Sequence, residues 1–204
     1  MNRALSISAL ALLGALAGCG DNIKGEEVGP GPVGTSRATL VYTDPSGGKL
    51  RLIKDPASTL GPTVTLDFVV GEAAQTGYAT GFDLPLAAPL TVSEFTPGTA
   101  LAPGEPAAAR ALVPTTGPLA NNLVAAQSQK ATGTGAVTTD TTLAPGTLLY
   151  KVTLTLTDGS RPGVMFDGAA PGFVLPTGGL RDRAGNTVVE AKDVAIGKLE
   201  LIVQ

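Results

Sequence analysis

Residues 151–157 read KVTLTLT and decide the fold class. Val152, Leu154 and Leu156 alternate with Lys151 and the threonines. Because successive side chains of a strand point to opposite faces of a sheet, this alternation predicts a strand with one buried and one solvated face. The same period of two occurs in three further stretches, residues 63–70, 81–86 and 198–203.

Shorter apolar runs and turn signals lie between these stretches. The runs are residues 39–43, 49–54, 90–95, 122–127, 163–167, 172–175 and 187–191. Turn-forming residues at 44–48 predict a hairpin between the first two runs, and those at 182–186 predict another tight reversal. About nine to ten strands at this spacing predict an all-β fold, an antiparallel β-sandwich of the jelly-roll type.

Three features depart from this regular pattern. Residues 106–113 are Ala-rich and bracketed by prolines, which makes them the one helix candidate. Pro85 predicts an edge strand or a bulge, since proline cannot donate a hydrogen bond to a ladder. Residues 96–104 and 130–142 are rich in Pro, Gly and Thr, and we expect long loops or irregular edge strands there.

The composition excludes several functional classes. The chain has 204 residues, a formal net charge of −3, no His, no Trp and a single Cys. Without His, no Ser-His-Asp or Cys-His pair and no His-ligated metal site can be built. The acidic balance provides no basic surface for nucleic acid, so we expect no nucleic-acid partner.

The N-terminus has the pattern of an export signal. Arg3 precedes a mostly apolar run over residues 4–17, which is too short to span a bilayer and fits the h-region of a secretory signal. The following residues Leu16, Ala17, Gly18 and Cys19 resemble the bacterial lipobox. The resemblance implies cleavage before Cys19, diacylglycerol on the Cys19 thiol and acyl chains such as palmitate as the membrane anchor.

The sequence therefore divides into three parts. Residues 1–18 are expected to be a lipoprotein signal peptide, and residues 19–36 the lipidated Cys19 followed by a flexible linker rich in Gly and Pro. Residues 37–204 are the predicted sandwich domain. Asp21 lies one place beyond the position that favours inner-membrane retention, so we expect an outer-membrane lipoprotein, on its periplasmic or surface face.

A further resemblance covers most of residues 38–204. The stretch 82–98, which begins FDLPL and ends FTPG, resembles a segment of cohesin domains. Residues 64–71 and 148–156 resemble flanking strands, and residues 180–186 with 197–201 resemble the terminal turn and strand. The resemblance implies a nine-strand jelly-roll that binds partners without catalysis. Ala87 and Ala88 replace the Tyr-Asp of the cohesin turn, so no dockerin binding is inferred. The likeness extends to carbohydrate-binding modules.

Two places are candidate binding sites. Tyr78 follows Gly77 in a loop-like stretch and is the best candidate for stacking on a ligand; the alternative is a rim residue that covers the core. Asp182 and Asn186 place oxygens in a turn, as calcium loops do, but Asp and Asn also stabilise turns through their own backbone. The same applies to residues 158–160. We expect no metal or cofactor beyond the covalent lipid.

The acidic residues leave open one catalytic alternative, a hydrolase with two carboxylates. A glycosidase needs two carboxylates, and Asp67, Asp83 and Glu94 lie on or beside predicted strands, although outward polar positions explain them equally. The sequence as a whole favours a lipid-anchored, non-catalytic binding or scaffolding module with an unidentified protein or glycan partner. A carbohydrate- or ligand-binding accessory module and a carboxylate-pair hydrolase remain alternatives.

Overall fold

The computed structural model describes residues 38–87, 90–101, 109–157 and 161–203. The expected signal peptide, Cys19, the linker and the acidic turn at 158–160 lie outside this part of the chain. The described residues contain fifteen strand segments and one 3-10 turn. The segments are β1 Ala38–Thr43, β2 Leu50–Lys54, β3 Thr63–Val70, β4 Gln75–Gly77, β5 Ala79–Pro85, β6 Leu90–Pro97, β7 Ala109–Leu112, β8 Asn122–Ser128, β9 Thr141–Leu143, β10 Leu148–Leu156, β11 Gly163–Asp167, β12 Thr177–Arg181, β13 Thr187–Val189, η1 Ala191–Asp193, β14 Val194–Ile196 and β15 Lys198–Val203.

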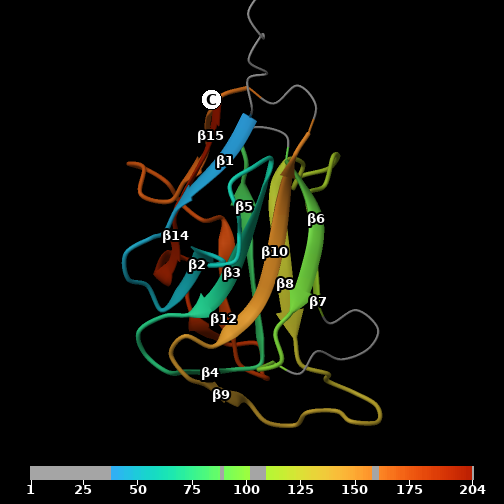
Figure 1. The fold of residues 1–204 in the computed structure, drawn as a ribbon. Helices are drawn as coiled ribbons and strands as arrows, with labels where there is room; N and C mark the ends of the chain where they lie inside the picture. The colour runs from blue at the N-terminus through green and yellow to red at the C-terminus, as the bar shows by residue number, and fades with distance from the viewer. Residues whose placement is uncertain (1–37, 88–89, 102–108, 158–160, 204) are drawn as a thin grey trace, which may run out of the picture. The chain divides into compact units, whose positions relative to one another are not determined.

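Two five-stranded sheets form the sandwich (Figure 1). Sheet I has the strand order β14-β2-β3-β10-β6, and sheet II has the order β13-β12-β5-β8-β7. Figure 1 shows β3, β10 and β6 in front of β5 and β8. The predicted all-β sandwich is confirmed. One pair departs from the antiparallel expectation, because β14 runs parallel to β2.

The core lies between the two sheets. Phe68 of β3 and Tyr150 of β10 pack against Phe82 of β5, with ring centroids 5.1 and 6.1 Å from that of Phe82. Leu154 of β10 and Leu84 of β5 are both 0 % exposed, so the alternation read from the sequence points its apolar side chains inward. Burial of these side chains supplies the main driving force for folding.

A third, smaller sheet joins the two ends of the described chain. It has the order β1-β15-β11. Tyr42 of β1 connects it to sheet I, because its hydroxyl donates to the Leu52 carbonyl at 2.6 Å and accepts from the Gly197 backbone N–H at 2.8 Å. The hairpin predicted at 44–48 is therefore wrong: β1 pairs with β15, while β2 pairs with β3 and β14.

Three other local expectations are corrected. The described part of the helix candidate is residues 109–113, of which 109–112 form β7, which pairs with β8. Residues 172–175 form no strand, although Leu175 still packs into the core. Pro85 lies in a central strand, between β12 and β8, but it is the last residue of β5, where a missing N–H disturbs the ladder least.

Candidate functional site

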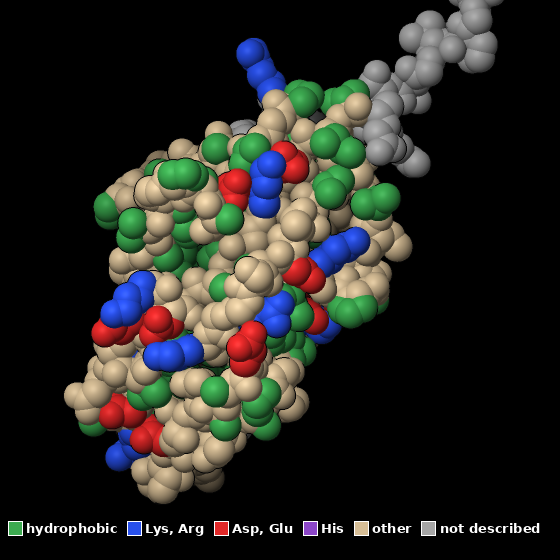
Figure 2. Space-filling view, turned by 90° about the vertical axis from the view of Figure 1, so that its left-hand side faces the viewer, with side chains coloured by type: hydrophobic (Ala, Val, Ile, Leu, Met, Phe, Trp, Pro, Cys, Tyr) green, Lys and Arg blue, Asp and Glu red, His purple; other side chains and the backbone are tan. Residues whose placement is uncertain are grey.

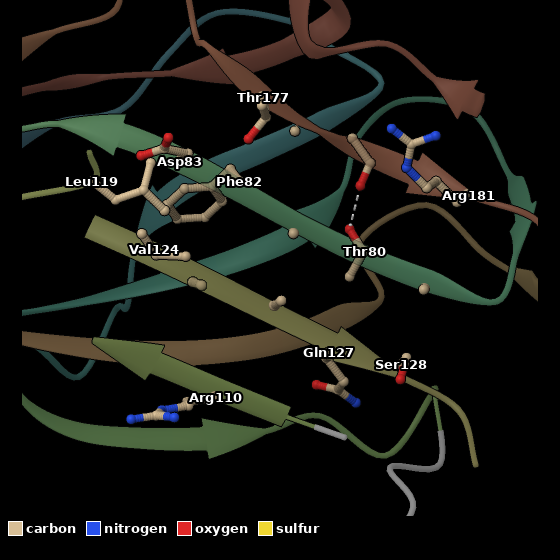
Figure 3. A pocket seen from close by; sticks show the side chains of 16 residues that line it. Thr80, Phe82, Asp83, Arg110, Leu119, Val124, Gln127, Ser128, Thr177 and Arg181 are labelled. Atoms are coloured by element: carbon tan, nitrogen blue, oxygen red, sulfur yellow. Dashed lines mark hydrogen bonds between the residues drawn. The ribbon is translucent and has the colours of Figure 1, made fainter. Parts of the chain in front are cut away.

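A groove crosses the outer face of sheet II (Figure 3). Gly81 of β5 is paired with Gly179 of β12 on one side and with Ala126 of β8 on the other. Three neighbouring strands therefore carry nothing larger than a methyl group at this level of the sheet. The small side chains leave a hollow of about 560 Å³, whose lining comes from β5, β7, β8, β12 and Leu119 of the β7–β8 loop.

Asp83 is the next outward residue after Gly81 along β5 and lines one end of the groove. It is 5 % exposed, and its Oδ1 atom is buried without a hydrogen-bond partner in the described part of the chain. Val124, its partner on β8, and Leu119 line the same end, where Figure 3 labels all three side chains. Thr177, its partner on β12, forms no hydrogen bond with Asp83 among the described residues, and the apolar neighbours cannot replace the water that a carboxylate loses on burial. This group is therefore held in an unfavourable environment.

Two arginines lie along the groove. Arg110 of β7 is paired with Ala126, is exposed, and forms no ion pair or hydrogen bond with another described residue. Arg181 of β12 is engaged, because its guanidinium donates to the Gly185 carbonyl and to the Thr187 hydroxyl, both at 3.1 Å. Figure 3 shows Arg110 across β8 from Asp83, with no interaction drawn between them.

The groove supports binding better than two-carboxylate chemistry. Asp83 is the single acidic side chain among the described residues that line it. Asp67 and Glu94 belong to sheet I, on the strands on either side of β10, and so do not meet Asp83. The three carboxylates considered for a hydrolase are thus divided between the two sheets, and the described groove contains no acid–base pair.

Asp67 belongs to a closed ionic cluster. The Lys151 ammonium lies 2.6 Å from Asp55 Oδ2 and 3.1 Å from Asp67 Oδ1. The hydrogen bond from Lys151 holds the pKa of Asp55 below its ordinary value, whereas burial raises the pKa of Asp67. The hydrogen bonds to both carboxylates raise the pKa of Lys151. One ammonium is thus shared by two carboxylates, an arrangement typical of a structural ion-pair cluster.

Tyr78 is held inside the molecule. It is 6 % exposed, its hydroxyl donates to the Val137 carbonyl at 3.1 Å, and its backbone bonds to Arg181 and Gln129. The structure places it as a residue covering the core, so its ring offers little surface on which a sugar could stack.

The turn at residues 182–186 is held together by hydrogen bonds between its own residues. The Asn186 backbone N–H donates to Asp182 Oδ1 and its side-chain amide donates to Oδ2, both at 2.8 Å. The hydrogen bond from the Asn186 side-chain amide lowers the pKa of the Asp182 carboxyl. Both carboxylate oxygens are thus engaged by the turn's own groups, as in an Asx turn. Over the described residues no group of three Asp, Glu, Cys or His side chains could hold a metal ion.

A second hollow, of about 690 Å³, lies beside the β1-β15-β11 sheet and is lined in part by Phe173, Val174 and Ile196. Val174 is 74 % exposed.

Figure 2 shows that acidic and basic side chains on the face turned toward the viewer occur singly or in small mixed groups rather than as a broad patch of one sign.

Sequence reasoning missed two features of the groove. Asp83 was expected as an ordinary outward polar residue, but the structure buries it. Arg110 was placed in a helix candidate, and pairing with β8 brings it to the groove instead. A signal was present in Gly81 and Gly179, because glycine inside a strand often marks a close approach by a ligand or another backbone.

No protein-family model, curated protein or solved structure matches this chain. Within the described residues, no helix has the length and hydropathy needed to cross a bilayer.

Proposed function

We propose that this chain is a lipid-anchored envelope lipoprotein whose β-sandwich acts as a non-catalytic binding module, with the groove of sheet II as its binding site. The match of residues 16–19 to the lipobox supports the anchor, and an outer-membrane position fits the placement of Asp21. The cohesin-like pattern supports partner binding by a sandwich. The fold itself is common to many unrelated functions, so the argument depends on the site.

The unpaired burial of Asp83 is the observation that carries this proposal. Most buried polar side chains in folded proteins are hydrogen-bonded, and an exception calls for a physical reason. Binding sites often keep such groups at the expense of stability, because a ligand supplies the missing partner. The hollow beside Asp83 gives a ligand the space to do so.

The anchor is tested by Cys19→Ser. The substitution removes the thiol that would carry the diacylglycerol, so we expect the protein to move from the membrane fraction to the soluble fraction. Intact-mass analysis of the wild-type protein should show a chain that begins at Cys19 and carries added acyl mass. A Cys19→Ser protein that stays in the membrane fraction, or a wild-type mature form without acyl mass, would contradict the anchor.

The groove is tested by filling it. Ala126 is exposed on the outer face, so Ala126→Trp should occupy the hollow without disturbing the core. Thr91→Trp, at an exposed position on edge strand β6 of sheet I, is the matched control. The probes are tri-alanine, chitotriose and phosphoethanolamine, titrated calorimetrically into the full chain in detergent.

We expect at least one probe to bind wild type and Thr91→Trp alike and to lose at least tenfold in affinity for Ala126→Trp. Binding of none of the three probes, or equal binding to both tryptophan variants, would overturn the assignment of the groove as the site.

A further inference from the structure

We propose that the groove binds a short peptide with free ends, whose terminal ammonium meets Asp83 and whose terminal carboxylate meets Arg110. This inference rests on the proposed function, since it specifies the ligand of the same site. It follows from two unpaired charges of opposite sign at the groove, one buried and one exposed.

The Asp83 end selects a cation. The residue is 5 % exposed, and Leu119 and Val124 line the groove at its end. Thr177, paired with it on β12, forms no hydrogen bond with it among the described residues. An ammonium group delivers a compensating charge and up to three N–H donors to a carboxylate that has no hydrogen-bond partner among the described residues. A neutral hydroxyl would leave the charge uncompensated.

The Arg110 end selects an anion. Its guanidinium is free among the described residues, and its planar fork matches a carboxylate in bidentate geometry. Arg181 is less suitable, since its guanidinium already donates to Gly185 and Thr187. A ligand with both charges therefore lies across β8, between β5 and β7.

The strand register sets the length of the ligand. Asp83 is paired with Val124, Val124 with Leu112, and Arg110 lies two residues before Leu112 on β7. Two inter-strand spacings and two residues along the strand separate the Cα atoms of Asp83 and Arg110 by about 12 Å. When the two side chains turn toward each other, an extended peptide of two or three residues spans the distance that remains between them.

The floor of the groove selects small side chains. Gly81, Gly179 and Ala126 let a peptide backbone lie close to the sheet. Phe82 is the aromatic residue of the described lining, and it is 3 % exposed, so no ring is presented for a sugar to stack on. Alanine methyl groups fit this floor, with Leu119 and Val124 as apolar contacts.

Calorimetric titration of tri-alanine into the full chain in detergent tests the inference. Acetylation of the peptide N-terminus should weaken binding to wild type at least tenfold, and amidation of the C-terminus should weaken it about threefold. In Asp83→Asn the free and acetylated peptides should bind equally, and in Arg110→Gln the free and amidated peptides should bind equally. Glu94→Gln and Arg183→Gln, exposed positions away from the groove, are the matched controls and should behave as wild type.

The outcomes separate the two proposals. If acetylation has the same effect on wild type and Asp83→Asn, the ammonium does not meet Asp83 and the inference is overturned. A second outcome is that tri-alanine fails to bind while chitotriose or phosphoethanolamine binds wild type and loses affinity for Ala126→Trp. In that case the inference fails and the groove remains a binding site. If no probe binds, the proposed function fails as well.

Discussion

The two outer faces of the sandwich treat buried charge in opposite ways. On sheet I, Asp67 is 8 % exposed and its Oδ2 accepts a hydrogen bond from Lys151 at 3.3 Å. Its Oδ1 has no hydrogen-bond partner among the described residues but lies 3.1 Å from the same ammonium, which also holds Asp55. Hydroxyl groups elsewhere on sheet I pair with one another, as Thr155 does with Ser93 at 2.8 Å. On sheet II, Asp83 is buried to a similar extent and has no partner among the described residues.

The difference separates a structural face from a face with spare binding capacity. A buried charge that is paired and hydrogen-bonded contributes to one defined structure, whereas an unpaired one lowers stability until something binds it. Gly81, Gly179 and Ala126 leave a hollow next to Asp83, whereas Asp67 is paired with the longer side chains of Lys151 and Ile53. The predictions below test this contrast, from the largest expected effect to the smallest.

The contrast assumes that alternate residues of β10 face the core and the outside. Leu154→Asp should unfold the domain, with a loss of at least about 4 kcal/mol, because it places a carboxylate in a site that is 0 % exposed. Thr155→Asp, one residue along on the outer face, should change stability by less than about 1 kcal/mol. Chemical denaturation measures both, and an unchanged transition for Leu154→Asp would show that the burial pattern is wrong.

Removal of the Lys151 ammonium should leave sheet I, like sheet II, with a buried carboxylate that has no paired cation. Lys151→Met leaves Asp55 and Asp67 without their shared cation, and we expect a loss of roughly 1–3 kcal/mol at pH 7, since the cluster is partly exposed. Denaturation of the variant and wild type side by side gives the difference. No measurable loss would mean that the cluster is not what distinguishes the two faces.

The same variant has a defined pH dependence. The pKa of Asp55 is lowered in the folded protein, so its pairing with Lys151 stabilises fully above the unfolded pKa of about 4 and is lost as pH falls through the folded value. The pKa of Asp67 is raised, so the penalty for its ionisation disappears as pH falls. The gap in stability between wild type and Lys151→Met should therefore narrow below about pH 4; a gap that widens there would contradict the assignment.

Two buried tyrosines show the same difference between a polar group with hydrogen-bond partners and one without. Tyr42→Phe removes a hydroxyl that bonds Leu52 and Gly197, and we expect a loss of about 1–2 kcal/mol. Tyr150→Phe removes a buried hydroxyl without a partner among the described residues, and stability should stay equal or rise slightly. Thermal unfolding of the pair compares them directly. Equal losses would contradict the difference between satisfied and unsatisfied groups.

The sequence predicted the fold class because one physical rule, alternation with a period of two, places residues such as Leu66 and Leu154 in the core. It failed where pairing is non-local. Nothing near residues 44–48 indicates that β1 pairs with β15 at the other end of the described chain. Residues 109–112 have helical composition, and pairing with β8 overrides it.

The candidate site was less predictable for the same reason. Nothing in the sequence connects Asp83 with Arg110, and strand register alone brings both to one groove. Tyr78 lies in a loop-like stretch of sequence, but backbone hydrogen bonds to Arg181 and Gln129 hold it inside the protein. Local composition indicates which residues are polar; register decides which of them are left without partners.

The free energy of unfolding of Asp83→Asn, measured without ligand at pH 7, tests the central claim most directly. Removal of an unpaired buried charge should raise stability by roughly 1 kcal/mol. Asp55→Asn, which removes a paired charge from sheet I, should lower it by about 0.5–1 kcal/mol. A loss of stability in Asp83→Asn as large as that in Asp55→Asn would show that Asp83 has a structural partner and would contradict the account.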